Sequence, residues 1–224
     1  MIQALVFDLD DTLYPESEFV ASGYRAVARH VARQYGCCDR DVFRAMMSAF
    51  ATYGRECVLP TLNRQFLAEK VELSELVEVY RAHTPQIGLF AGYGDLLSNL
   101  RESYRLGIIT DGLPEVQKRK VQALKLGDKV DHIVYTWEHG KEMQKPHPHS
   151  FLYMMGLLGS EPSTSLFIGD NLEKDLQGAH GAGMKYVQVQ ACGKKGRTSG
   201  RVNADEAEYV VESLHPLPRI LRDM

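Results

Sequence analysis

The sequence predicts an α/β fold with a parallel sheet, interrupted near its start by a block of helices. From residue 104 onward, short apolar segments alternate with helical patterns, as expected of parallel strands joined by right-handed crossovers. One further apolar segment, Ala4–Phe7, precedes residues 18–83, which show only helical spacing. The sequence therefore predicts one sheet-based domain that carries an all-helical insertion.

The first predicted strand ends in a dense group of carboxylates. Ala4–Phe7 is an unbroken apolar run, typical of a strand buried on both faces, and Asp8, Asp10 and Asp11 follow it. In open α/β sheets, ligands bind beyond the carboxyl ends of the strands. On an extended chain Asp8 and Asp10 share one face and repel each other unless a cation lies between them. Mg²⁺, a hard ion that prefers oxygen ligands, is the cation that this pattern favours.

The helical insertion is predicted to hold four helices. Their expected limits are Gly36 as the end of the first, Asp39 as the N-cap of the second, Thr61 and Ser74 near the starts of the third and fourth, and Thr84-Pro85 as the final stop. The predicted boundaries are residues 1–16 and 86–224 for the sheet domain and 17–85 for the insertion.

The later elements alternate along the chain. Predicted strands are residues 104–112, which end in a polar turn, and residues 132–135, 165–170, 185–189 and 209–211. Predicted helices are residues 116–124, which form a basic amphipathic pattern, 150–158, ended by Gly159, and 175–182. Polar clusters at the ends of three strands predict one shared site at that edge of the sheet.

These clusters carry a family resemblance. Four short motifs resemble, in order, those of the haloacid dehalogenase-like phosphatases. They are Asp8-Leu9-Asp10-Asp11-Thr12, Thr110, Lys145 in Lys-Pro-His-Pro, and Gly169-Asp170 with Asp175. The resemblance covers nearly the whole chain. It implies a Rossmann-like parallel-sheet core and identifies residues 17–85 with the family's inserted α-helical cap domain.

The resemblance also implies roles for the residues. Asp8 is expected as the nucleophile that forms an aspartyl-phosphate, and Asp10 as the general acid that later acts as a base. The other assignments are Thr110, Asp111, Gly112 and Lys145 for binding the substrate phosphoryl group, and Asp8, Asp170 and the backbone carbonyl of Asp10 for Mg²⁺. Asp175 is expected to orient Lys145 or a bound water, with capping of its own helix as the alternative.

The expected function is Mg²⁺-dependent hydrolysis of a phosphomonoester in a small phosphorylated metabolite, with the cap selecting the substrate. Alternatives on the same scaffold are a pyrimidine or mononucleotide 5′-nucleotidase, a phosphomutase, and a non-catalytic binding protein. Asp10 argues against a dehalogenase, because that branch of the family lacks the second aspartate.

The composition of the chain excludes some classes of binding partner. The 224 residues carry a formal charge of −3, which argues against nucleic acid, and the longest apolar run is too short for a membrane span. We expect a cytoplasmic monomer or homodimer without a signal peptide, with its four cysteines reduced.

Several residues keep two interpretations. His139, His147 and His149 lack a zinc-ligand pattern and are expected near the cleft. Trp137 is expected to pack rather than to stack on substrate, and the loop Lys194–Arg201 either stays solvated or contacts an anionic substrate. The large predicted cap residues are Phe19, Tyr24, Phe43 and Tyr53, most of them expected in packing.

Overall fold

The computed structural model describes residues 1–68, 71–190 and 207–224. The chain divides into two compact units. The core unit comprises Met1–Glu16 and Gly88–Met224, and the helical unit comprises Ser17–Ile87. None of the described helices is both long and apolar enough to cross a membrane.

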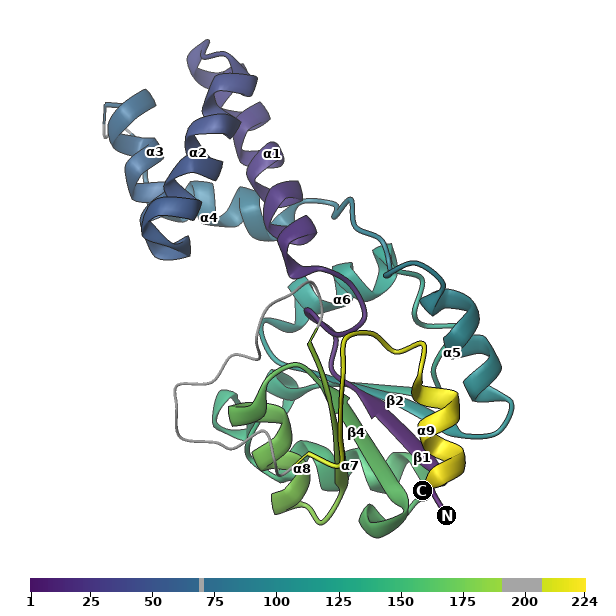
Figure 1. Cartoon of the computed structure of the whole chain (residues 1–224). Coiled ribbons are helices and arrows are strands. Elements are labelled where there is room, and N and C mark those ends of the chain that lie inside the picture. Colours follow the sequence, from purple (N-terminus) through teal and green to yellow (C-terminus); the bar gives the residue numbers. More distant parts are fainter. Residues whose placement is uncertain (69–70, 191–206) are drawn as a thin grey trace. The chain divides into compact units, whose positions relative to one another are not determined.

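The core unit is built on a six-stranded parallel sheet of order β3-β2-β1-β4-β5-β6 (Figure 1). The strands are β1 Ala4–Phe7, β2 Arg105–Thr110, β3 His132–Tyr135, β4 Ser165–Gly169, β5 Lys185–Val189 and β6 Tyr209–Val211. All residues of β1 are buried, and Ala4 pairs with Arg105 on one side and Ser165 on the other. The predicted Rossmann-like α/β architecture is confirmed, and its central strand is the one that leads into the carboxylates.

Helices cover both faces of this sheet. They are α5 Tyr93–Arg101, α6 Pro114–Ala123, α7 His149–Leu158, α8 Gln177–Gly181 and α9 Leu217–Asp223, with short 3₁₀ turns at Thr136–His139, Lys141–Met143 and Pro162–Thr164. Side chains alternate along a strand, so Ala4 and Val6 join one buried cluster with Phe151 and Met154 of α7. Helix α9 crosses the opposite face (Figure 1).

The segment after β4 begins its helix earlier than predicted. A π-helical turn, Leu172–Leu176, precedes α8, whereas the sequence pattern placed the start at Asp175. The side chain of Asn171 accepts hydrogen bonds from the backbone N–H groups of Glu173 and Lys174, both at 3.1 Å. Asn171 is therefore the N-cap, and Asp175 is left for another role.

The helical unit contains α1 Glu16–Tyr35, α2 Asp39–Tyr53, α3 Val58–Phe66 and α4 Leu73–Ala82, with a 3₁₀ turn at Arg55–Cys57. Two predicted starts are wrong. Cys38 occupies the N-cap of α2 and Asp39 lies in its first turn, where an acidic side chain favours the helix dipole. Helix α3 begins at Val58 rather than Thr61, because Pro60 is tolerated in a first turn. Gly36 ends α1 at a φ of 70°, as predicted.

The large aromatic residues of this unit differ in exposure. Phe19 and Tyr24 are buried, and Tyr24 belongs to the core that joins the four helices. Phe43 is partly buried against the same core, whereas Tyr53 is 66% exposed. Three of the four therefore pack, as expected.

Candidate active site

The predicted motif residues of the core unit meet at the carboxyl ends of β1, β2 and β4. Asp8, Asp111 and Asp170 each directly follow one of these strands. A cavity of about 170 Å³ opens there, which we call the acidic cavity. Its lining comprises Asp8, Asp10, Asp11, Glu16, Asp111, Lys145, Asp170, Asn171, Lys174 and Asp175. Parallel strand order thus gathers residues that lie far apart in the sequence.

Lys145 lies between two carboxylates. Its side chain is 3% exposed, and Nζ donates to Oδ1 of Asp8 and, at 2.7 Å, to Oδ1 of Asp175. Burial acts to lower the pKa of Lys145, but Asp175, Asp8 and Asp111 outweigh it and raise that pKa well above its ordinary value. Lys145 is therefore a permanent cation at the floor of the acidic cavity.

Asp175 is positioned by the backbone around it. Its Oδ2 accepts a hydrogen bond from the Asn171 N–H at 3.0 Å, and its own N–H donates to the Asn171 carbonyl at 2.7 Å. A Cβ at Gly169 would overlap the Asp175 carboxylate, so the glycine permits this close approach. Asp175 contacts Lys145 directly and does not cap its helix.

The carboxylates around Lys145 fit a divalent cation. Asp8, Asp170 and Asp175 each place an oxygen such that the three lie within 4.8 Å of one another. Burial raises the pKa of Asp8 well above its ordinary value, and Asp175, Asp170 and Asp10 add to this while Lys145 opposes it. One buried lysine does not neutralise three carboxylates, and a hard dication with oxygen ligands relieves the remaining repulsion.

Asp10 turns its carboxylate toward helix α6. Lys120 Nζ donates to both carboxylate oxygens at 2.8 Å, Gln117 Nε2 donates to Oδ2 at 3.1 Å, and the Tyr14 hydroxyl donates to Oδ1. Burial acts to raise the pKa of Asp10, but Lys120, Tyr14 and Gln117 lower it overall. The Asp10 side chain is therefore held as a carboxylate, outside the three-carboxylate group.

Two residues shape the segment between Asp10 and helix α1. Tyr14 is fully buried, and both burial and Asp10 raise the pKa of its hydroxyl. Asp11 has a φ of 57°, and its Oδ1 accepts a hydrogen bond from the Glu16 N–H at 2.9 Å. Asp11 thus shapes the turn into α1, the structural role that its place in the motif favours.

Thr110 and Gly112 lie beside this network at the end of β2. The Thr110 hydroxyl is buried and accepts a hydrogen bond from Gln117 Nε2. A hydroxyl that accepts through one lone pair keeps its own hydrogen for another acceptor. Gly112 has a φ of 122°, a conformation that favours glycine in the turn into α6.

Asp111 connects the strand end to the loop that carries Lys145. Its Oδ1 accepts from the Thr136 hydroxyl at 2.8 Å and from the Lys145 backbone N–H at 3.1 Å. Its Oδ2 contacts Lys174 Nζ at 3.2 Å. The Asp111 side chain therefore fixes the position of the Lys145 backbone.

Sequence reasoning missed Lys120, Gln117, Lys174 and Asn171. The basic amphipathic pattern of α6 was visible, but it does not show which basic residue turns inward. Gln117 and Lys120 are three residues apart and so share one helix face, and both are buried. No sequence signal singles out Lys120, because packing decides which basic residue of α6 is buried.

The remaining candidates lie elsewhere. His139 and His149 contact Tyr153, with ring centroids 4.6 and 6.1 Å away, and none of the three candidate histidines lines the acidic cavity. The expectation that they lie at the cleft is therefore wrong for this cavity. Trp137 donates to Gln144 at 3.1 Å. The loop Lys194–Arg201 lies outside the described residues.

Comparisons with known proteins place the chain in a family. A model of the haloacid dehalogenase-like hydrolases matches residues 5–189. The chain is 28% identical to a glyceraldehyde 3-phosphate phosphatase of Methanopyrus kandleri, over 100% of this chain and 99% of that protein. It is 33% identical to the N-acylneuraminate-9-phosphatase of Mus musculus, over 58% of this chain and half of the relative.

A solved structure agrees with this fold. The magnesium-bound putative hydrolase YfnB of Bacillus subtilis matches with a TM-score of 0.68 at 22% identity, over 98% of each chain. The family model spans both strand-end aspartate motifs and the lysine between them. The chain therefore belongs to the haloacid dehalogenase-like hydrolases, the family that its four motifs resemble.

Proposed function

We propose that the protein is a Mg²⁺-dependent phosphatase that hydrolyses a small phosphorylated metabolite through an aspartyl-phosphate on Asp8. The class, a phosphoric monoester hydrolase, is that of several relatives in the family. The observation that carries the finer proposal is the contact of buried Lys145 with Asp8 and Asp175, beside Asp170 and within one cavity. Such a site combines a nucleophile with charge that stabilises a phosphoryl group.

The reaction proceeds in two displacements at phosphorus. In the first, an Asp8 oxygen forms a bond to phosphorus, the bond to the leaving oxygen breaks, and Asp10 gives that oxygen a proton. In the second, Asp10 takes a proton from a water whose oxygen attacks phosphorus, and the bond to Asp8 breaks. Phosphate and the free Asp8 carboxylate result. Because the resting Asp10 is a carboxylate, the first step requires its protonation, which an adjacent phosphate dianion favours.

The phosphoryl oxygens are held by donors already in place. Lys145 supplies a fixed positive charge, and the Thr110 hydroxyl donates the hydrogen that its bond from Gln117 leaves available. Gln117 bridges Thr110 and Asp10, so it couples the phosphate-binding group to the acid–base group. The backbone around Asp111 and Gly112 is the further source of donors that the motif implies.

We assign three groups as ligands of Mg²⁺: the carboxylates of Asp8 and Asp170 and the backbone carbonyl of Asp10. Asp175 is less suited, because its Oδ1 contacts Lys145 and its Oδ2 accepts from the Asn171 N–H. The ion, when bound, supplies positive charge that offsets the charge of the phosphoryl oxygens.

The helical unit, Ser17–Ile87, is our candidate for a cap that closes the site and selects the substrate. Its insertion in the sequence directly after the first motif supports this assignment. In the Bacillus subtilis hydrolase, the magnesium-bound structure reveals an interdomain movement.

A phosphate-release screen tests the activity. With Mg²⁺ present, we expect release from at least one of glyceraldehyde 3-phosphate, N-acylneuraminate 9-phosphate and a pyrimidine 5′-nucleotide, at a rate well above that of Asp8→Asn protein. Release from the nucleotide alone would favour the nucleotidase alternative. Movement of phosphate between hydroxyls of one sugar, without free phosphate, would favour a phosphomutase. Equal rates for both proteins on all substrates would exclude a phosphatase at this site.

Lys120→Met should lower kcat by about 10²-fold, because Asp10 loses its charged partner and its fixed position for both proton transfers. With an activated aryl phosphate the leaving group needs no proton, so only the second step should suffer. We therefore expect a burst of released phenol followed by slow turnover, which rapid-mixing kinetics would record. Lys120→Arg, which retains the charge, should stay within about tenfold of the wild type.

The matched control is Lys118→Met on the same helix. Lys118 pairs with Glu138 at 2.6 Å, but its side chain is 55% exposed, so its loss should leave the kinetics unchanged. If Lys120→Met shows the same small effect as Lys118→Met, Lys120 does not position Asp10.

A further inference from the structure

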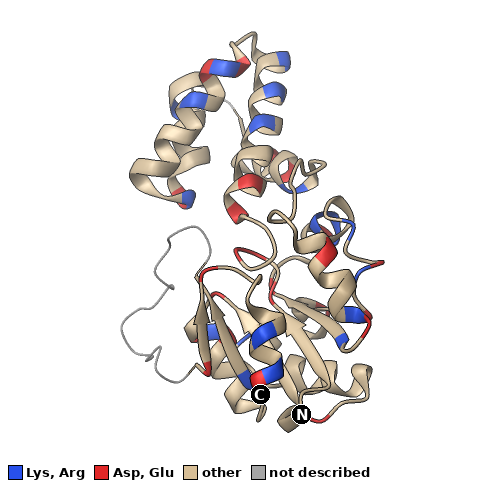
Figure 2. Cartoon of the chain, turned by 45° about the vertical axis from the view of Figure 1, so that its right-hand side comes forward, with Lys and Arg blue, Asp and Glu red and all other residues tan. Residues whose placement is uncertain are grey.

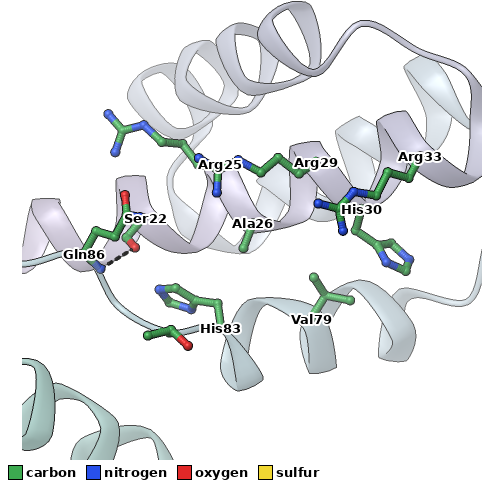
Figure 3. A pocket seen from close by; sticks show the side chains of 10 residues that line it. Ser22, Arg25, Ala26, Arg29, His30, Arg33, Val79, His83 and Gln86 are labelled. Carbon is green, nitrogen blue, oxygen red and sulfur yellow. Dashed lines mark hydrogen bonds between the residues drawn. The ribbon is translucent and has the colours of Figure 1, made fainter.

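A second cavity, of about 390 Å³, lies within the helical unit between α1 and α4 (Figure 3). Its walls include Arg25, Arg29, His30 and Arg33 from α1, and Val79 and His83 from α4 and its end. We call it the basic groove. No aspartate or glutamate among the described residues lines it, although the whole chain carries a net negative charge. Basic segments recur along α1 (Figure 2).

The floor of the basic groove is fixed by packing. His83 is 8% exposed, and its Nδ1 donates to the Tyr80 carbonyl at 2.6 Å. A side chain at Gly23 would overlap the Tyr80 ring, so the glycine lets α4 approach α1 closely. The Gln86 N–H donates to the Ser22 hydroxyl at 2.9 Å and holds the segment after α4 against α1. The floor of the groove is thus built by packing, and the exposed side chains of Arg25, Arg29 and Arg33 form its rim.

Two of its arginines have no acidic partner. Arg29 and Arg33 lie four residues apart and share one helix face, and neither pairs with a carboxylate within the part of the chain that the structure describes. Arg25 lies 4.9 Å over the Phe43 ring, and His30 contacts Glu75 at 2.7 Å. Like charges at this spacing repel, so α1 carries a cost that an anion bound between Arg29 and Arg33 would remove.

We propose that the basic groove binds a phosphate-type dianion, free or carried by a small metabolite. The guanidinium fork of arginine matches the oxygens of such an anion in paired hydrogen bonds. Two neighbouring guanidinium groups carry two positive charges, so they suit a dianion better than they suit a ligand with a single carboxylate. The volume also lies within the range of small-molecule sites, roughly 300–1,000 Å³.

Inorganic phosphate is the probe, titrated into the full-length protein without metal and followed by NMR of backbone amides and arginine Nε–H groups. We expect saturable shifts of Arg29, Arg33 and the segment 79–86, beyond those caused by chloride at equal ionic strength. Arg29→Gln with Arg33→Gln should weaken this binding at least tenfold. No saturable shift in the groove of the wild-type protein would overturn the proposal.

Arg40→Gln with Arg44→Gln is the matched control, because both arginines are exposed on α2 and lie outside the groove. This pair removes the same charge and should leave the phosphate shifts intact. If it weakens binding as much as the groove pair does, the effect is general electrostatics and no site exists.

The same metal-free titration separates the two sources of the dianion. If a metabolite carries the dianion, glycerol 3-phosphate should shift the groove resonances at a lower concentration than inorganic phosphate does. If free phosphate is the ligand, inorganic phosphate should bind at least as tightly as glycerol 3-phosphate. The NMR result stands whichever source applies, so failure of the activity and failure of the site remain distinguishable.

Discussion

Asp8→Asn should lower turnover of every phosphate ester by about 10³-fold or more, while the protein stays folded. The amide is nearly isosteric with the carboxylate, but it is a poor nucleophile and cannot form the aspartyl-phosphate. Phosphate release under saturating substrate and Mg²⁺ gives kcat, and trapping of labelled phosphate on denatured protein reports the intermediate. Activity within tenfold of the wild type would remove Asp8 from the nucleophile's role.

The Asp8→Asn substitution should affect turnover and the free energy of unfolding in different directions. Burial and the surrounding carboxylates raise the pKa of Asp8, so its ionised form carries a cost in the metal-free fold. The neutral amide removes that cost, while Lys145 keeps Asp175 as a charged partner. We therefore expect the metal-free variant to unfold at the same urea concentration as the wild type or a higher one. Asp95→Asn, an exposed position in the first turn of α5, is the control: it should leave turnover unchanged and slightly lower the unfolding concentration, because a favourable charge at the helix N-terminus is lost.

The fold could be predicted because each central strand is a short apolar run that can be recognised in the sequence. Ala4–Phe7, Ile108-Ile109 and Leu166–Ile168 are fully buried runs, and parallel connectivity then fixes where their ends meet. Asp8 follows the first of these runs directly, and Gly169 alone separates Asp170 from the last, so their proximity needs no knowledge of side-chain direction. Helix limits were less predictable, because Pro60 and Asn171 allow starts that apolar periodicity alone does not show.

The hydrogen-bond partners of Asp10 could not be predicted from the sequence. Its partner Lys120 lies 110 positions away on a helix with several basic residues, and only packing decides which of them turns inward. Lys118, two residues earlier, is exposed and pairs with Glu138. Tyr14 was missed for a related reason, since its burial depends on the tight turn at Asp11 rather than on strand or helix periodicity.

Removal of divalent metal should abolish turnover, by at least about 10³-fold, and Mg²⁺ should restore it. The three carboxylates Asp8, Asp170 and Asp175 surround one buried lysine, so without the ion the site keeps an excess of negative charge that repels a phosphate ester. Ca²⁺ should restore little, because its larger and more flexible coordination misplaces the nucleophile. Full activity in excess chelator would exclude the metal from the reaction, and rescue by Zn²⁺ alone would point to histidine ligands instead.

Metal binding should also be visible without substrate. An ion that binds only the folded state stabilises it by about 2.7 kcal/mol at a hundredfold excess over its dissociation constant, which is a clear rise in Tm. We expect Mg²⁺ to raise the Tm of the wild type and of the Asp95→Asn control. The Asp170→Asn protein should lose this rise. That substitution removes one of the three carboxylates but leaves the contacts of Lys145 intact. If Asp170→Asn keeps the full Mg²⁺-dependent rise, the ion binds elsewhere, and the acidic cavity is not the metal site.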